Sequence, residues 1–407
     1  MEINRGDLTM KEEINYEKLG VSSQKEDVHE AIKNVDKGLF PSAFCKVIPD
    51  ILAFNEEKCL IVHADGAGTK SVIAYLSWKE YDDPSIFKGI SQDALVMNVD
   101  DIACCGFLTN FSISNTIGRN KFLVNGSVIK SIIKGYQEFT NTMNDLGCSM
   151  ILCGGETADV GDLVRTVIVD STVIARGSKN EVIQTKNIIP GDVIVGLSST
   201  GQASYESDYN SGISSNGITL ARHVILDHSY MEKYPEICDP SVNKNIAYQG
   251  KYFLDNPLPN APMTIGDGLL SPTRSYIPIL LDIFSELCEE GKTQEKIHGI
   301  IHNTGGGQTK CLKFGSGLHY IKNNLFPIPP IFKLIQTAGK VEWQEMYKVF
   351  NMGHRLEIMC PKDIAKDIIE ISNKFNVDAK IIGRVEASHD GVKNKLTITS
   401  EPGNYCY

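Results

Sequence analysis

The sequence predicts an α/β protein of two domains. At 407 residues the chain exceeds the size at which a single hydrophobic core usually stops growing. Between residues 58 and 176, short β-rich runs alternate with longer helical runs, and after residue 187 a similar plan begins again. The turn Asn187-Ile-Ile-Pro-Gly-Asp192 leads into an apolar strand. We therefore expect one domain over residues 1–186 and a second over residues 187–407.

The first half shows the alternation most clearly. Runs rich in β-branched and aromatic residues predict strands over residues 59–64, 107–114, 149–153 and 165–176. A repeat of apolar residues every three to four positions predicts helices over residues 71–79, 90–105 and 124–146. Strands that alternate with helices indicate an α/β fold.

The second half repeats this pattern less regularly. Strands are predicted over residues 193–197, 297–301, 355–359 and 379–385, and helices over residues 217–226, 276–289 and 364–375. Residues 226–272 show no clear period and predict a large loop with one short helix, which is unusual in a compact domain and typical of a segment that covers a site. The polar tail from Ala387 to Tyr407 predicts either an edge strand or a loose segment.

Composition excludes several classes of protein. The hydrophobic fraction is 42% and no apolar run approaches the roughly 18 residues that a membrane span requires. The N-terminus lacks the features of a signal peptide, so we expect a cytoplasmic protein. Eleven cysteines without a CxxC pair argue against structural zinc and for reduced thiols. The net charge of −10 argues against nonspecific nucleic-acid binding, although a local phosphate site remains compatible with it.

The strongest local signal is Leu60-Ile-Val-His-Ala-Asp65-Gly66-Ala-Gly68-Thr69-Lys70, an apolar strand that runs into a polar turn. Glycine lets backbone N–H groups approach phosphate oxygens, lysine supplies positive charge, and Asp65 is suited to hold Mg²⁺. The spacing fits neither the GxxxxGK[ST] phosphate loop nor the GxGxxG dinucleotide fingerprint. A tight turn capped by aspartate is the structural alternative.

Three later segments carry the same kind of chemistry. Asp100 and Asp101 lie at the edge of an apolar helical face, where a carboxylate needs a partner such as a cation, although Asp100 is equally well explained as a cap or a solvated acid. Glu156 follows Cys153-Gly154-Gly155 at the end of a predicted strand. Asp65, Asp101 and Glu156 are thus candidate ligands for Mg²⁺ over a nucleotide.

The third segment is glycine-rich. His302-Asn-Thr-Gly305-Gly306-Gly307 follows a predicted strand of the second half. Three consecutive glycines are poor core material and favour a close backbone approach to an anion, with a flexible loop as the alternative.

These segments together resemble the aminoimidazole ribonucleotide synthetases, also called phosphoribosylformylglycinamidine cyclo-ligases, over nearly the whole chain. The family's Asp-Gly-Val-Gly-Thr-Lys, Val-Asn-Asp and Gly-Gly-Glu-Thr-Ala-Glu correspond to the three acidic segments above. Two strings point to this family among related ATP-using enzymes. They are Leu270-Ser-Pro-Thr-Arg-Ser-Tyr276 and Glu345-Met-Tyr-Lys-Val-Phe-Asn-Met-Gly353, and the N-terminal Tyr16-Glu-Lys-Leu-Gly-Val21 is also similar.

The resemblance implies ATP-dependent ring closure of formylglycinamidine ribonucleotide, through phosphorylation of its formyl amide oxygen, in purine biosynthesis. It implies a homodimer whose N-terminal domains complete a β-barrel, with Mg²⁺ and, as a further candidate cation, K⁺. It assigns Asp65, Asp101 and Glu156 to metal and catalysis, and Lys70 to phosphate. It assigns the nucleotide to Gly66, Gly68, Thr69, Gly154, Gly155, Asn216, Gly305 and Gly306, together with either Lys33 or Lys37.

The chain also departs from the family. Residues 202–213 are inserted before Ser214-Ser-Asn-Gly217, and Ser214 stands where the family has histidine. We expect this insertion to order over the nucleotide as a lid. Gln308-Thr-Lys310 replaces the family's Glu-Asn arm. Two alternatives stay open: a related enzyme such as a selenophosphate synthetase, thiamine-phosphate kinase or hydrogenase maturation factor, or a catalytically silent nucleotide-binding scaffold. Cys45 lacks the glycines expected of the selenophosphate enzyme.

Overall fold

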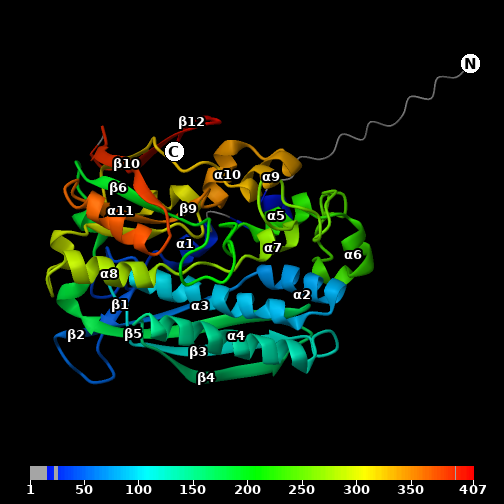
Figure 1. Cartoon of the computed structure of the whole chain (residues 1–407). Helices are drawn as coiled ribbons and strands as arrows, with labels where there is room; N and C mark the ends of the chain where they lie inside the picture. The colour runs from blue at the N-terminus through cyan, green and yellow to red at the C-terminus, as the bar shows by residue number, and fades with distance from the viewer. Residues whose placement is uncertain (1–15, 23–25, 390) are drawn as a thin grey trace, which may run out of the picture.

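The computed structural model describes residues 16–22, 26–389 and 391–407, and the chain folds around two mixed β-sheets (Figure 1). The N-terminal stretch examined for a signal peptide lies outside the described residues. The first sheet has the strand order β1-β2-β5-β3-β4, and β3 and β4 are its parallel pair. Its strands are β1 (Val47–Pro49), β2 (Lys58–Gly66), β3 (Phe111–Arg119), β4 (Met150–Asp159) and β5 (Val167–Ser178).

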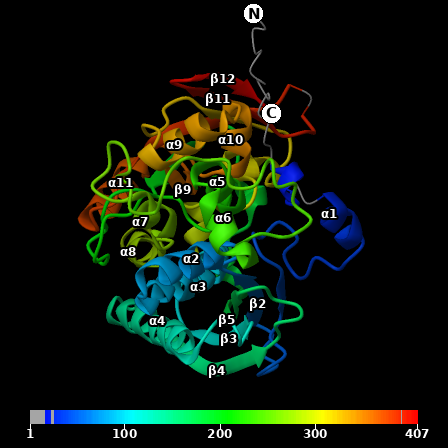
Figure 2. The same cartoon turned by 90° about the vertical axis from the view of Figure 1, so that its right-hand side faces the viewer.

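Helices cover one face of this sheet, which we call the inner face (Figure 2). They are α2 (Lys70–Tyr81), α3 (Phe87–Ala103) and α4 (Gly126–Asp145). Val169, Ser171 and Val173 alternate along β5 and are buried beneath them. On the opposite, outer face, Val62 is 51% exposed and Ile168 is 39% exposed. Alternation of side chains along each strand thus gives the sheet one packed face and one open face.

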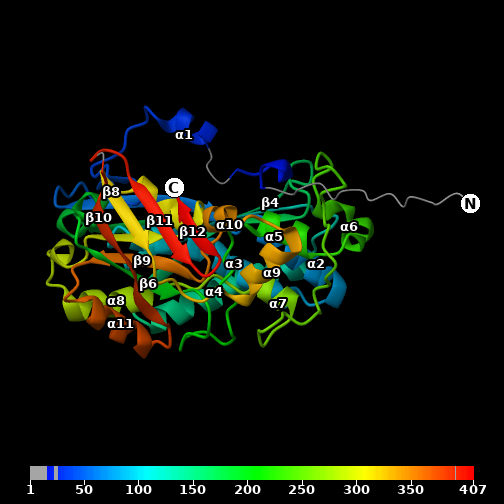
Figure 3. The ribbon, with the colours of Figure 1, turned by 90° about the horizontal axis from the view of Figure 1, so that it is seen from above.

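The second sheet has seven strands in the order β12-β11-β8-β10-β6-β9-β7, several of which lie side by side in Figure 3. They are β6 (Val193–Ser198), β7 (Gly299–His302), β8 (Leu318–Lys322), β9 (His354–Cys360), β10 (Ala379–Ala387), β11 (Lys395–Ser400) and β12 (Gly403–Cys406). The remaining helices are α1 (Glu26–Ile32), α5 (Ile218–Ile225), α6 (Ser229–Lys233), α7 (Ile265–Leu270), α8 (Ile277–Leu287), α9 (Pro330–Gly339), α10 (Trp343–Val349) and α11 (Ala365–Lys374). Within the described residues, no helix combines the length and apolar character needed to cross a bilayer.

Most predicted elements appear, with three differences. The strand predicted over 107–114 begins only at Phe111, because Asn110 has a positive φ of 61° and turns the chain. The strand predicted over 149–153 continues to Asp159. The segment 226–272 contains two short helices, α6 and α7, where one was expected. The tail forms β11 and β12, as predicted for an edge.

Candidate active site

Two adjacent carboxylates near the C-terminal end of α3 form the centre of the site. Asp100 and Asp101 are 1% and 7% exposed. Asp100 accepts hydrogen bonds from Ser275 Oγ at 2.6 Å and from the Tyr276 N–H at 3.1 Å. Burial raises the pKa of Asp100 to about 7, although Arg355 and these bonds favour the charged form. Asp100 is therefore a buried, hydrogen-bonded acid and neither a cap nor a solvated residue.

His302, the last residue of β7, holds Asp101. Its Nδ1 lies 2.7 Å from Asp101 Oδ1, and Arg355 Nε lies 2.9 Å from its Nε2. Because guanidinium nitrogen only donates, Nε2 accepts and Nδ1 carries the proton that is donated to Asp101. Burial lowers the pKa of His302 to about 4, so the ring is neutral at pH 7. Sequence reasoning did not assign His302, although its place at the start of the glycine-rich string was the available signal.

A second imidazole, that of His63 on β2, faces the other oxygen of Asp101. His63 Nε2 lies 3.7 Å from Asp101 Oδ2, and His63 Nδ1 lies 2.9 Å from Asn98 Oδ1. The Asn98 amide nitrogen donates to the backbone carbonyls of Asp65 and Ser171, so its oxygen is the acceptor for His63 Nδ1–H. This network ties the strand that carries Asp65 to the helix that carries Asp101.

Asp101 is kept ionised by its surroundings. Burial raises its pKa, but the charge of Lys310 and the hydrogen bond from His302 outweigh burial and leave the pKa below its ordinary value. Lys310 Nζ also lies 2.5 Å from Thr304 Oγ1, in the glycine-rich segment. The site thus offers a negatively charged oxygen beside a cation and a neutral, fixed imidazole.

The turn after β2 brings two of the predicted nucleotide residues toward the second half. Asp65 is exposed and its Oδ1 accepts from the Gly66 N–H at 2.7 Å. Gly68 has a φ of +57° with open space around it, which suits a close approach by a ligand. Thr69 Oγ1 lies 2.8 Å from Thr219 Oγ1 in the first turn of α5. The predicted residue Thr69 therefore meets the second half of the chain here, at Thr219, which was not predicted as a site residue.

The second glycine-rich segment lies against the same region. A Cβ placed on Gly305 would stand 4.0 Å from Asn216 Nδ2, and Gly306 has a φ of +95°. Ser215 Oγ, Asn216 Oδ1 and Asn303 Oδ1 are among the buried polar atoms that have no hydrogen-bond partner within the described residues. Because buried polar groups are normally paired, these atoms indicate a polar ligand.

Lys70, predicted as a phosphate contact, is held inside the chain in this structure. Its side chain is fully buried, and Nζ donates to Asp93 Oδ1 at 2.9 Å and to the Ser271 carbonyl at 2.5 Å. Asp93 Oδ1 also accepts from the N–H and Oγ1 of Thr273. Since Lys70 is the first residue of α2 and its side chain is buried, these bonds fasten residues 271–273 to α3.

Glu156 lies apart from the other two acids. Across the first sheet, Gly66 pairs with Asp170, Asp170 with Thr116, and Thr116 with Glu156. Three strand spacings of about 4.8 Å put Glu156 about 14 Å from β2. Asp65 precedes Gly66 on β2 and pairs with buried Ser171, so the Asp65 side chain lies on the inner face of the sheet. Glu156 lies in the same cross-strand row as Gly66 and therefore faces outward.

The glycines around Glu156 also differ from their predicted use. Gly154 has a φ of +96° and forms a bulge within β4, where the register with β3 shifts. A side chain at Gly155 would collide with Asn115, and one at Gly66 would collide with Asp170. These glycines meet packing requirements inside the sheet. Asp170 was not predicted as a functional residue, and burial raises its pKa.

The predicted metal ligands therefore do not assemble within one chain. Among the described residues, no group of three His, Cys, Asp or Glu side chains is placed to hold a metal ion. Asp65 fits an ion that a nucleotide brings with it, because Mg²⁺ often takes one or two carboxylates and completes its shell with phosphate and water. Glu156, on the outer face, does not fit that ion in the single chain.

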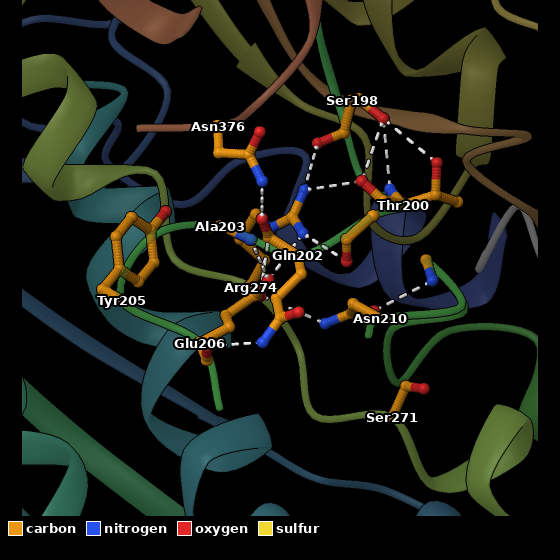
Figure 4. A network of polar contacts seen from close by, with 12 residues as sticks. Ser198, Thr200, Gln202, Ala203, Tyr205, Glu206, Asn210, Ser271, Arg274 and Asn376 are labelled. Atoms are coloured by element: carbon orange, nitrogen blue, oxygen red, sulfur yellow. Dashed lines mark hydrogen bonds and ion pairs between the residues drawn. The ribbon is translucent and has the colours of Figure 1, made fainter. Parts of the chain in front are cut away.

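Residues of the insertion 202–213 form a network of polar contacts around Arg274, which we call the clamp (Figure 4). Arg274 is buried and donates to both carboxylate oxygens of Glu206, at 3.0 and 2.6 Å, and to the carbonyls of Ser198, Thr200 and Gly201. This satisfies the whole guanidinium group.

Neighbouring residues of the insertion extend the clamp. Tyr205 OH donates to the Ser275 carbonyl at 2.6 Å, and Asn210 Nδ2 donates to the Pro272 carbonyl at 2.7 Å. Ser214, at the position of the family histidine, is 2% exposed with its Oγ 3.5 Å from Thr273 Oγ1. The insertion is thus bound to the segment that supports Asp93 and Asp100, in contrast to the expected lid.

Comparisons with known proteins follow the same two halves. Residues 45–176 match the family model "AIR synthase related protein, N-terminal domain", and residues 277–394 match "AIR synthase related protein, C-terminal domain". The phosphoribosylformylglycinamidine cyclo-ligase of Methanococcus vannielii is 33% identical over 348 residues, which are 84% of this chain and 82% of that protein. The enzyme of that name from Methanocaldococcus jannaschii is 31% identical over 341 residues, 83% and 81% of the two chains.

A solved structure gives an independent view of the architecture. A chain in the structure titled "Crystal structure of HypE-HypF complex" aligns with a TM-score of 0.52 at 14% identity, and the match covers 95% of this chain and 98% of that chain. At this identity the likeness concerns the fold alone.

Proposed function

Because the chain belongs to the AIR synthase related family, with both its N-terminal and its C-terminal domain, we propose that it is a phosphoribosylformylglycinamidine cyclo-ligase. In this proposal it closes the imidazole ring of aminoimidazole ribonucleotide from formylglycinamidine ribonucleotide with ATP, as a step of purine biosynthesis. The curated relatives named for this activity are matched over most of their length.

One observation of the structure carries the proposal. The turn at residues 65–69, the carboxylate of Asp101 and the segment 302–306 converge from both halves of the chain, and buried polar atoms of Ser215, Asn216 and Asn303 face no partner there. A site built from both halves suits a reaction that holds a nucleotide beside a second substrate, since each half contributes part of the contact surface.

The reaction asks for positioning and charge stabilisation. The formyl amide oxygen attacks the γ-phosphorus of ATP and ADP leaves. A neighbouring nitrogen then attacks the resulting iminophosphate carbon, the ring closes, and inorganic phosphate departs with the former amide oxygen. Ring closure is intramolecular once the chain is held in place, and good alignment lowers such a barrier by up to about 7–11 kcal/mol. Fixed charges and hydrogen bonds stabilise the phosphoryl group.

The geometry supports the following residue roles. Asp101, charged and oriented by His302, would interact with the nitrogen protons of the substrate during closure. Asp65 would hold the Mg²⁺ that accompanies ATP, and that ion would offset phosphate charge. Gly68, Thr69 and Asn216 would contact the nucleotide. Lys70 supports the site from within, through Asp93 and Ser271.

The outer face of the first sheet supports a homodimer. Val62 and Ile168 expose apolar surface there, and β4 is an edge strand. Open apolar faces and free edges are normally covered, and a second copy is the usual cover in symmetric oligomers. In such a dimer the two N-terminal domains, residues 1–186, would share a barrel. Glu156 would then face the partner copy.

Cys45 disfavours the selenophosphate synthetase alternative. Its thiol is buried and donates to the Asp101 carbonyl with Sγ 3.3 Å from the oxygen. A hydrogen bond with Cys105 and burial both raise the pKa of this thiol well above its ordinary value. A reactive nucleophile requires the opposite, an accessible thiol with a lowered pKa.

A coupled assay tests the proposal. Purified protein is mixed with formylglycinamidine ribonucleotide, ATP and Mg²⁺, and both ADP and aminoimidazole ribonucleotide are measured. We expect the two products in equal amounts. ATP hydrolysis without the imidazole product, or turnover only with a substrate of another class, would contradict the proposed function. Light scattering checks the dimer against the single-chain mass of 44.9 kDa.

A further inference from the structure

A lysine-lined cavity lies beside the second glycine-rich segment. Its volume is about 330 Å³, at the lower end of the range of small-molecule sites. Its lining includes Gly306, Lys310, Lys313, Lys348 and Tyr407, and none of the described lining residues is acidic. In a chain of net charge −10, a cavity whose described lining has three lysines and no acidic side chain differs sharply from its surroundings. Such a concentration of positive charge indicates an anionic ligand.

Aromatic rings hold two of these lysines without neutralising them. Lys310 Nζ lies 4.8 Å from the centre of the Phe44 ring, and Lys348 Nζ lies 5.7 Å from the centre of the Tyr407 ring. A ring face attracts a cation but leaves its charge available to an anion. The described chain gives the Lys310 ammonium one hydrogen-bond partner, Thr304 Oγ1, so two of its three N–H groups can serve a ligand.

The cavity adjoins the carboxylate centre through Lys310. The charge of this lysine lowers the pKa of Asp101, so one ammonium influences both the cavity and the reacting region. A ligand with its anionic end in the cavity would therefore extend toward Asp101. Gly68 and Thr69, to which the proposed function assigns ATP, lie at another contact between the two halves, beside Thr219, and do not line the cavity.

We infer that this cavity binds the phosphate monoester of the ribonucleotide substrate, with Lys310 and Lys348 as its phosphate-binding side chains. The inference rests on the proposed function for the identity of the substrate. It also accounts for Gln308-Thr-Lys310, the segment that departs from the family: Lys310 brings a cation to the cavity, while Gln308 is buried and donates through Nε2 to the Asn351 carbonyl. The phosphates of ATP share this chemistry, and the experiment separates the two sources.

Calorimetric titration of the full chain with two probes tests the inference. Ribose 5-phosphate represents the substrate's phosphate, and a non-hydrolysable ATP analogue with Mg²⁺ represents the nucleotide. Charged hydrogen bonds to phosphate are strong enough that Lys348→Met should weaken ribose 5-phosphate binding at least about 10-fold, and Lys310→Met at least as much. Affinity for the ATP analogue should stay within about twofold. Lys366→Met is the control, since Lys366 is exposed and paired with Glu370.

The outcomes separate this inference from the proposed function. Absent ribose 5-phosphate binding, unchanged affinity in Lys348→Met, or a loss confined to the ATP analogue would each overturn the cavity assignment. If the wild type forms aminoimidazole ribonucleotide while Lys348→Met keeps its affinity, only the inference fails. If Lys348→Met loses ribose 5-phosphate while the wild type gives no imidazole product, only the proposed function fails. Thermal unfolding checks that each variant is folded. If Lys310→Met does not fold, Lys348→Met alone is enough to test the inference.

Discussion

The inner and outer faces of the first sheet each present an acidic residue from a glycine-containing strand, but the surroundings of the two acids differ. Asp65 and Glu156 both stand beside glycines on strands of this sheet, yet Asp65 lies on the helix-covered side with Asn98, whereas Glu156 lies on the open side with Asp170 and Thr116. A shift of one residue along a strand moves a side chain from one face of the sheet to the other. The same local chemistry therefore lies in the candidate site in one case and on an exposed surface in the other.

This difference predicts that changes behind the inner face have the larger effects, and Lys70 should show the largest. Lys70→Met leaves Asp93 buried without its cation, and breaking a buried pair in this way costs about 3–5 kcal/mol. Urea unfolding measures the loss. Lys88→Met is a matched control, because Lys88 pairs with Glu138 at the surface and should matter by less than about 1 kcal/mol. Full stability with weakened ATP binding would instead restore Lys70 as a phosphate contact.

Asp101 should dominate turnover. Asp101→Asn removes the charge that His302 orients and that Lys310 faces, and loss of one preorganised charge-stabilising group costs roughly 10²–10³-fold in kcat. The coupled assay measures kcat, and circular dichroism checks the fold. A variant that turns over within about threefold of the wild type would show that the centre of the site lies elsewhere.

The clamp around Arg274 should have an intermediate effect. Glu206→Gln replaces one charged acceptor of the buried Arg274 guanidinium by an amide, and charged hydrogen bonds are worth about 1.5–3 kcal/mol. We expect the free energy of unfolding to fall by about 2 kcal/mol. Glu138→Gln, on the exposed side of α4, is the comparison and should change it by less than about 1 kcal/mol. Equal effects would mean that the insertion is loosely attached.

Long periodic segments were predictable from sequence because their signal is local. The alternation along β5 and the apolar face of α3 each extend over many residues, so strand and helix were correctly predicted. The meeting of Thr69 with Thr219 could be expected only from the resemblance, since it joins residues 150 positions apart.

The differences between expectation and structure concern properties that local sequence does not encode. The bulge at Gly154 sets which face receives Glu156, and a bulge is recognised only from the neighbouring strand. Lys70 lies in a sequence that resembles a phosphate-binding turn, but the carboxylate to which it donates, that of Asp93, lies on α3. His302 gains its role from Arg355 on β9 and Asp101 on α3, so the histidine alone gave little indication.

The smallest effects should come from a direct comparison of the two acids in Mg²⁺-dependent binding of an ATP analogue. Asp65 is inward-facing beside the open turn at Gly68, so Asp65→Asn should weaken binding about 10-fold, the scale of one charged contact. Glu156 lies about 14 Å away across the sheet and on its other face, so Glu156→Gln should change the affinity less than twofold. Calorimetry should be run with light scattering on the same samples. A tenfold loss for Glu156→Gln in a sample with twice the single-chain mass would mean that Glu156 reaches the nucleotide of the partner copy, and the two faces would then belong to one shared site.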